Sequence, residues 1–213
     1  LELLWADEFE SETFNRSKWH VFDEWKSSVC RGNELGQLHC NMDQPRNLQL
    51  RDGCLAIAAT RETSYSAAID MKYSAAMITT AENWTYGRFE IRAALPKGKM
   101  LRPAVYLVPE REEEHWPRDG QIDILTNVQK PKLGNGAHYT GKYHGSGLDF
   151  VTGGANLQDF HTYAVQWNQT LIQWFFDETN RGLDFNIDRK LDVSYERTRQ
   201  PFDRPFRIRL SLG

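Results

Sequence analysis

The feature that most constrains this chain is a series of short runs in which apolar and polar residues alternate. The clearest run is Tyr86–Leu95, YGRFEIRAAL, where every second residue from Phe89 to Leu95 is apolar. The residues between them, from Arg88 to Arg92, are charged. A period of two is typical of a strand with one buried and one wet face. The run therefore predicts a half-buried β-strand.

Turn signals separate these runs. The segment Asn47–Thr60, NLQLRDGCLAIAAT, reads as two strands joined at Asp52-Gly53, a strong hairpin signal. Further strands are predicted over Leu1–Phe9, Ala76–Thr80 and Leu171–Asp177. No long amphipathic helix pattern, internal repeat or low-complexity stretch is present. Roughly a dozen short strands with turns between them predict an all-β sandwich.

Length and charge narrow the function classes. With 213 residues the chain is expected to form a single domain, 1–213. Its formal net charge is −3 and it has no basic block, which argues against a nucleic-acid partner. No apolar run approaches 18 residues, so no membrane span is predicted. Aromatic residues are 12% of the chain, which suits a β protein with a carbohydrate cleft but equally suits an aromatic-rich core.

Three cysteines and three glycosylation sequons indicate whether the protein is secreted or intracellular. Cys30 and Cys40 bracket a glycine-containing loop and are predicted to pair, which leaves Cys54 over. Three free thiols in an intracellular protein is the alternative. The sequons begin at Asn15, Asn83 and Asn168, all in turn-like contexts, and together they favour a secreted glycoprotein.

The stretch Trp116–Val128, WPRDGQIDILTNV, resembles the catalytic strand of glycoside hydrolase family 16, whose pattern is WP-x-x-G-Glu-x-Asp-x-x-Glu. In that family the first Glu is the nucleophile, the second is the general acid/base, and the Asp tunes the nucleophile. The three positions here hold Gln121, Asp123 and Thr126. The frame is present, and both catalytic carboxylates are absent.

The chemistry explains why this matters. A retaining glycosidase needs two carboxyl groups about 5–5.5 Å apart. The amide of Gln121 is a very poor nucleophile, and Thr126 has no proton to exchange near neutral pH. On a regular strand residue 126 would face away from 121, so bringing the two together requires a β-bulge. The alternative is an ordinary half-buried strand in which Asp123 is incidental.

The resemblance extends from Leu1 to Leu212, through motifs such as LLWADEF and DFHTYAVQW. It implies further strands over Gly136–Tyr143, Asp159–Trp167 and Pro201–Leu210. It implies a concanavalin-like jelly-roll β-sandwich with a concave cleft. The residues that it places at the cleft are Glu34, Arg88, Arg102, Tyr106, Trp116 and His138. Arg102 and Tyr106 stand where the family has its two cleft tryptophans, a change expected to weaken or reshape glucan binding.

Each of these assignments has an ordinary structural alternative. Glu34 could be a solvated loop acid, and Arg88 could belong to a wet strand face with weak ion pairs. His138 could be a structural histidine. No acidic cluster has the spacing of a calcium site, so no metal or other cofactor is predicted.

The family includes a branch without the catalytic glutamates, the invertebrate Gram-negative-binding and β-1,3-glucan-recognition proteins of innate immunity. This chain resembles that branch, in which the glucanase-like domain usually follows a small N-terminal glucan-binding module. The resemblance therefore implies a domain cut from a longer secreted chain and lacking its final strands. It also implies non-catalytic recognition of microbial polysaccharide, either β-1,3-glucan or bacterial envelope glycan.

Three alternatives stay open. The domain could be a scaffold that only contacts protein partners, such as extracellular serine proteases of an immune cascade. It could be an active endo-β-1,3-glucanase with a remodelled site that uses a displaced acid from Glu110–Glu114. It could also be a glucanase inactivated in the laboratory at Gln121, although Thr126 would still leave it without an acid catalyst.

Overall fold

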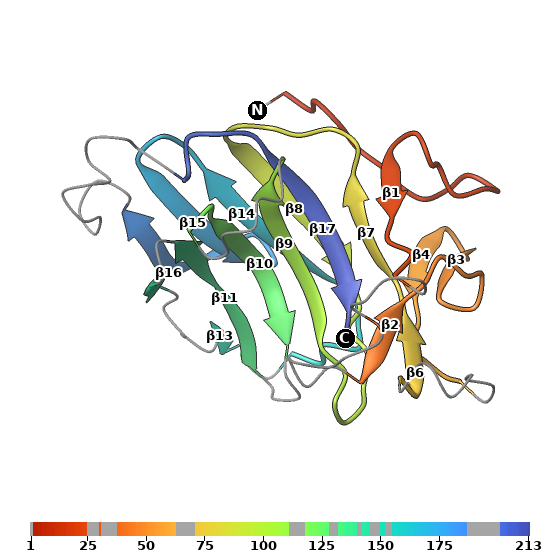
Figure 1. Ribbon diagram of the computed structural model, residues 1–213. Helices are drawn as coiled ribbons and strands as arrows, with labels where there is room; N and C mark the ends of the chain where they lie inside the picture. Colours follow the sequence, from red (N-terminus) through yellow and green to blue (C-terminus); the bar gives the residue numbers. More distant parts are fainter. Residues whose placement is uncertain are drawn as a thin grey trace. The chain divides into compact units, whose positions relative to one another are not determined.

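The structure is a computed structural model that describes residues 2–24, 30, 38–62, 71–110, 118–127, 132–139, 142–144, 150–151, 155–186 and 201–213. Its named elements are all β-strands (Figure 1). The chain divides into two compact units, which are described separately below. The first unit comprises residues 1–81 and 211–213, and the second comprises residues 82–210. No helix in the described part of the chain is long and apolar enough to cross a membrane.

The first unit is built from short strands. They are β1 (Trp19–Val21), β2 (His39–Asn41), β3 (Leu48–Arg51), β4 (Cys54–Ile57), β5 (Thr60–Arg61), β6 (Tyr73–Ala75) and β7 (Met77–Thr80). β1 pairs with β7, β6 lies between β2 and β5, and β3 pairs with β4. The predicted hairpin is confirmed: Asp52 and Gly53 both have positive φ, 52° and 70°, as a tight type I′ turn requires.

The prediction of a strand over Leu1–Phe9 is wrong, because none of the described residues of that segment joins a sheet. Side chains hold it instead. The indole Nε1 of Trp19 donates a hydrogen bond to Asp7 Oδ2 at 2.7 Å, and the ring of Trp5 packs edge-on against that of Trp19. Phe9 has a φ of 57°, which ends the extended run.

The second unit contains the longer strands. They are β8 (Gly87–Ala93), β9 (Pro103–Pro109), β10 (Gln121–Asn127), β11 (Lys132–Tyr139), β12 (Lys142–His144), β13 (Phe150–Val151), β14 (His161–Trp167), β15 (Leu171–Phe176), β16 (Thr179–Asn186) and β17 (Phe206–Leu212). One sheet has the order β17-β9-β10-β11-β12, with β13 beside β11, and the other has the order β16-β15-β14-β8. The end of β17, from Ser211 on, belongs to the first unit.

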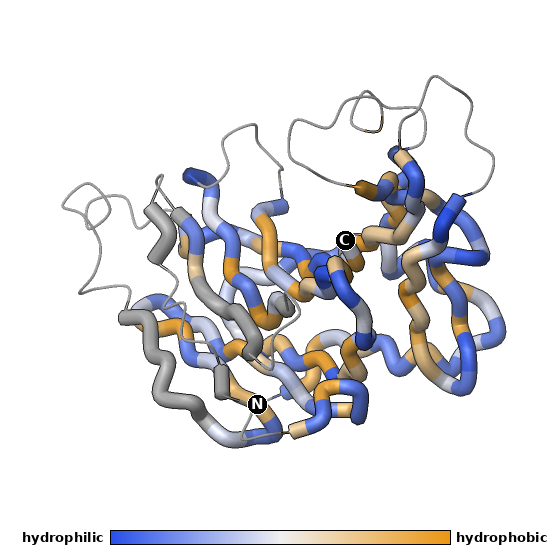
Figure 2. The backbone as a smooth tube through the Cα atoms, turned by 90° about the horizontal axis from the view of Figure 1, so that it is seen from below, coloured by the Kyte–Doolittle hydropathy of each residue, from blue (hydrophilic) through white to orange (hydrophobic). Residues whose placement is uncertain are grey.

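The two sheets of the second unit form two layers around an apolar core (Figure 1). Buried side chains of both layers fill it, among them Phe89, Leu107, Ile122, Tyr163, Val165, Trp167, Ile172 and Phe206. The rings of Trp167 and Phe206 meet across the layers with centroids 5.2 Å apart. Each large apolar side chain buried in this way contributes about 1.5–3 kcal/mol. The alternation of polar and apolar positions along the strands is visible in Figure 2.

The strand expected over Tyr86–Leu95 is confirmed as β8, and the hairpin of Asp159–Trp167 with Leu171–Asp177 is confirmed as β14 and β15. The single strand expected over Gly136–Tyr143 is wrong. β11 ends at Tyr139 and β12 begins at Lys142, and the two strands pair antiparallel with these residues opposite each other. The fold is the predicted all-β sandwich.

Candidate functional site

The stretch that carries the degenerate catalytic motif forms β10, in the middle of its sheet. Gly120 precedes the strand with a φ of 91°, which favours glycine. A Cβ atom there would lie 2.7 Å from Cγ of Pro201 and 3.2 Å from the ring of Phe206. Only glycine therefore lets the chain enter β10 at this point, and the local geometry places Gln121 at the first position of the strand.

β10 contains the β-bulge that the motif requires. Asp123 lies opposite Tyr106 on β9, and Thr126 lies opposite Ala104. Three residues of β10 thus match two residues of β9, and the register with β11 shifts over the same interval. Residues directly opposite each other share a face of the sheet. The bulge therefore returns Thr126 to the face that carries Gln121 and Asp123, as predicted.

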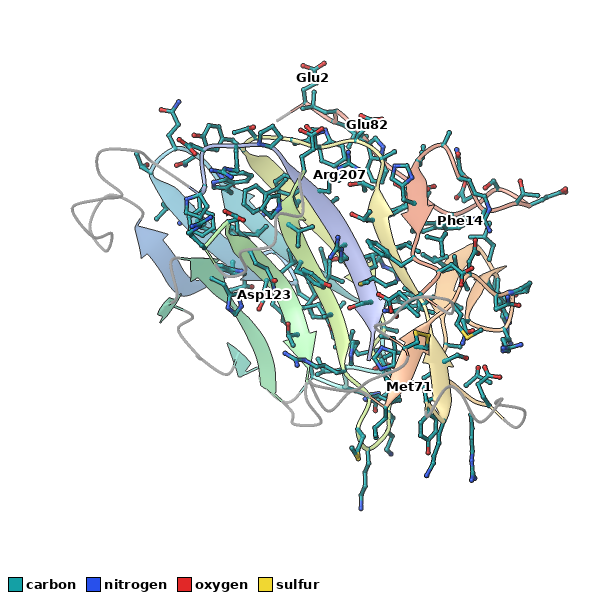
Figure 3. The ribbon with its side chains drawn as sticks, viewed as in Figure 1. Glu2, Phe14, Met71, Glu82, Asp123 and Arg207 are labelled. Carbon is teal, nitrogen blue, oxygen red and sulfur yellow. A yellow bond between two sulfur atoms is a disulfide. The ribbon has the colours of Figure 1, made fainter. Side chains whose placement is uncertain are left out.

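Asp123 is the centre of this face (Figure 3). The residue is only 8% exposed. The amide Nε2 of Gln121 donates a hydrogen bond to Oδ1 at 2.6 Å, and Nε2 of His138 lies 2.8 Å from Oδ2. The indole of Trp174, from the opposite sheet, donates to the backbone oxygen of Asp123 at 2.7 Å. Asp123 is thereby held on three sides.

Tyr106 and Arg209 continue the face across β9 and β17. The guanidinium carbon of Arg209 lies 5.8 Å from the centroid of the Tyr106 ring, within the range of a cation–π contact. Arg209 is 8% exposed. Sequence reasoning missed Arg209 and Trp174. The alternation of β17, FRIRLSL, could have identified Arg209, but nothing in the sequence places Trp174 next to Asp123.

The chemistry of this face follows from the side chains on β9, β10 and β11. Asp123 is the only acidic residue on β9, β10 and β11. Both of its oxygens have partners, and positions 121 and 126 offer an amide and a hydroxyl in place of carboxylates. Glu110, the residue after β9, instead accepts a hydrogen bond from Asn83 at 2.9 Å. The face offers donors, acceptors and an aromatic ring, the groups with which proteins hold neutral polar ligands.

The structure brings His138 and Tyr106 together with the degenerate motif, but it separates Arg88 from them. Arg88 lies on β8, in the other sheet, where its neighbour Phe89 points into the core. Its guanidinium pairs with Glu90 at 2.9 Å and stacks over the ring of Phe175 at 4.7 Å. The side chain of Arg88 therefore faces away from the core on the opposite layer of the sandwich.

Arg102 is exposed and comes directly before β9, two positions ahead of Ala104. Glu34 and Trp116 lie outside the described residues, as do the acids that follow Glu110 as far as Glu114. In the described part of the chain no cluster of three histidine, cysteine or acidic side chains could hold a metal ion.

The predicted Cys30–Cys40 disulfide is present, with a Cα–Cα distance of 5.5 Å, and Cys54 is free. Two of the three sequons have the same exposed geometry. The side-chain oxygen of Asn15 accepts a hydrogen bond from the hydroxyl of Ser17, and that of Asn168 accepts one from the hydroxyl of Thr170. Asn83 differs, because its amide nitrogen donates to Glu110.

Known proteins with similar sequences and structures place the chain in a family. Residues 25–212 match the family model described as "Glycosyl hydrolases family 16". The chain is 33% identical over 221 residues to a glucan endo-1,3-beta-glucosidase of Cryptopygus antarcticus, covering 99% of this chain and 79% of the relative. It is 26% identical over 122 residues to a beta-1,3-glucan-binding protein of Penaeus monodon, covering 49% and 33%.

The crystal structure of the laminarinase from Rhodothermus marinus superposes with a TM-score of 0.77 at 29% identity, covering 99% of this chain and 85% of that one. The expected jelly-roll architecture is confirmed by this neighbour. The family model and the Cryptopygus antarcticus relative both span most of the sequence. The chain therefore belongs to glycoside hydrolase family 16.

Proposed function

We propose that this domain recognises β-1,3-glucan without hydrolysing it, and that the face formed by β9, β10 and β11 is its binding surface. One observation carries the proposal. The bulge preserves the arrangement in which residues 121, 123 and 126 share a face, yet neither outer position has a carboxylate. The central Asp123 is held by Gln121 and His138. A site of this kind keeps the frame for a sugar ring without the nucleophile or the acid.

The names of the relatives support β-1,3-glucan as the ligand, and they also support an active glucanase as the alternative function. The Penaeus monodon relative is named as a glucan-binding protein, which agrees with recognition. The Cryptopygus antarcticus relative is named as a glucosidase and is more similar to this chain, which keeps an active endo-β-1,3-glucanase with a remodelled site as the second candidate. That candidate needs an acid other than Asp123 close to the bulge.

The setting that we propose is extracellular innate immunity. The Cys30–Cys40 disulfide and the exposed sequons at Asn15 and Asn168 fit a secreted glycoprotein. Recognition of microbial polysaccharide, and contact with immune serine proteases, would be the corresponding activities. The glycan partner has the stronger support, because it follows from the binding face itself.

Calorimetric titration with laminarin oligosaccharides, combined with a reducing-sugar assay on the same sample, tests the proposal. We expect binding without sugar release. Release above a heat-inactivated control would contradict the proposal and favour the remodelled glucanase. Absence of both heat and release would favour a scaffold that contacts proteins only.

A double variant tests whether the glucan lies over the bulge. The double substitution Gln121→Glu and Thr126→Glu restores both missing carboxylates on the face of Asp123. We expect it to release sugar from laminarin, because the bulge already holds the two positions on one face. The single substitution Gln121→Glu is the matched control and should release none, because it still lacks the acid. Binding without release by the double variant would place the glucan elsewhere.

A further inference from the structure

Basic residues gather in the segment that leads into β9, one strand of the candidate binding face. The segment between β8 and β9 includes residues 96–102, PKGKMLR, here called the basic loop. It holds Lys97, Lys99 and Arg102 and no acidic residue, and all three cations are exposed. The chain as a whole has a formal net charge of −3. The basic loop therefore concentrates a charge opposite in sign to that of the chain.

One backbone hydrogen bond lies just before the basic loop, and one close packing contact lies within it. The backbone N–H of Leu95, just before it, donates to the backbone oxygen of Leu157 at 2.7 Å, and both leucine side chains are buried. Within the loop Leu101 packs so closely over Gly98 that a Cβ atom there would lie 2.8 Å from its Cδ1. These two contacts restrict the backbone from which Lys97, Lys99 and Arg102 extend.

The basic loop leads directly onto the binding face. Arg102 lies two positions before Ala104, and Ala104 is opposite Thr126 on β10. At the next position along that face, Arg209 lies beside Tyr106. Cationic side chains thus lie next to the part of the face where positions 121 and 126 hold neutral side chains. Neutral side chains at positions 121 and 126 leave Asp123 as the one acidic residue on β9, β10 and β11, so an anionic ligand meets less repulsion there than it would beside three carboxylates.

We propose that the basic loop selects polysaccharides that carry anionic substituents, sulfate or carboxylate groups, over neutral glucan. The inference rests on the proposed glucan-binding function of the same face. Lysine and arginine donate charge-assisted hydrogen bonds to anionic oxygens, which are stronger than bonds to neutral hydroxyls. A neutral glucan would gain little from three exposed cations, whereas an anionic chain that leaves the face past Thr126 would pair with them.

The test compares three ligands of one chain length: laminarin, laminarin sulfate and carboxymethyl laminarin. Calorimetric titration of the wild type at low ionic strength should show tighter binding of at least one anionic form, and added salt should weaken that gain. The double substitution Lys97→Gln and Lys99→Gln should reduce affinity for the anionic form about tenfold, since each exposed ion pair contributes about threefold. Its affinity for laminarin should stay unchanged.

The matched control is the double substitution Arg51→Gln and Lys72→Gln, which removes two exposed cations of the first unit. It should leave all three affinities unchanged, and thermal melting should show both double variants folded. Equal affinities of the wild type for the three ligands, or equal losses in the two double variants, would overturn the inference alone. Failure of every ligand to bind would overturn the proposed function as well. The sulfate and carboxymethyl arms identify which anionic group is preferred.

Discussion

At the scale of single residues, Asp123 shows how a buried carboxylate is held in place. Its two side-chain oxygens meet Gln121 and His138, and its backbone oxygen accepts from Trp174. Removing a hydrogen-bond partner of a buried polar group typically costs about 1–3 kcal/mol, because the group is left unsatisfied. These contacts therefore link Asp123 to side chains from β10, β11 and β15 and fix its position on β10.

Tyr163 illustrates the opposite case, a buried polar group without compensation. Its hydroxyl oxygen is buried and has no hydrogen-bond partner among the described residues. The substitution Tyr163→Phe should raise the free energy of unfolding by about 1 kcal/mol, since it removes an unpaired polar group from the core. Urea denaturation at pH 7 measures the change. A loss of stability instead would show that the hydroxyl has a favourable partner.

The same residue predicts a dependence on pH. Burial, and then the charge of Asp177, raise the pKa of the Tyr163 phenol above its ordinary range. A group whose pKa is raised by folding contributes stability that is present below its unfolded pKa, about 10, and is lost above it. The advantage of the Tyr163→Phe variant over the wild type should therefore grow between about pH 9.5 and 11. A constant difference over that range would contradict this.

At the scale of elements, β10 depends on the turn that leads into it. Gly120 combines a positive φ with contacts too close for a side chain, whereas Gly53 has a positive φ and open space around it. Substitution of Gly53 would introduce backbone strain alone, whereas substitution of Gly120 would introduce both strain and steric clash. Gly120, the more crowded glycine, comes directly before Gln121. A substitution at Gly120 should therefore also disturb the face that carries Gln121 and Asp123.

The substitution Gly120→Ala should cost about 2–4 kcal/mol of unfolding free energy, because strain and overpacking add. The matched control Gly53→Ala should cost only about 1–2 kcal/mol, the strain alone. Chemical denaturation of both variants gives the comparison. If the two costs are equal, Pro201 and Phe206 move away without penalty and the contact does not shape the strand.

At the scale of the whole molecule, the first unit relies on a covalent link. Cys30 and Cys40 are almost fully buried and form a small core cluster with Met42 and Met71. The short strands of this unit bury little apolar surface each. A cross-link that closes a loop of this size is expected to contribute about 3 kcal/mol by restricting the unfolded chain.

Replacing Cys30 and Cys40 together by serine should therefore lower the melting temperature clearly, as measured by scanning calorimetry. Cys54→Ser is the matched control, because Cys54 is free and only half-buried. It should cost under about 1 kcal/mol. Equal shifts in the two variants would mean that the loss reflects serine at a cysteine position and not the lost cross-link.

The sequence by itself determined the local structure of this protein. The period of two in Tyr86–Leu95 specified β8, and Asp52-Gly53 specified a hairpin, because side-chain direction and turn geometry are short-range properties. The motif around Asp123 likewise required a bulge, which is present. The segment Leu1–Phe9 shows the limit: its alternation suggests a strand, but side-chain contacts with Trp19 hold it in another form.

Only the tertiary structure decided which side chains meet. His138 is 15 residues from Asp123 in sequence and Trp174 is 51 residues away, and both contacts depend on strand order and on packing between layers. The same order placed Arg88 on the opposite layer and Arg209 beside Tyr106. Periodicity assigns a side chain to a face of its strand. Its partners follow from the register between strands, which is set by burial across the whole sandwich.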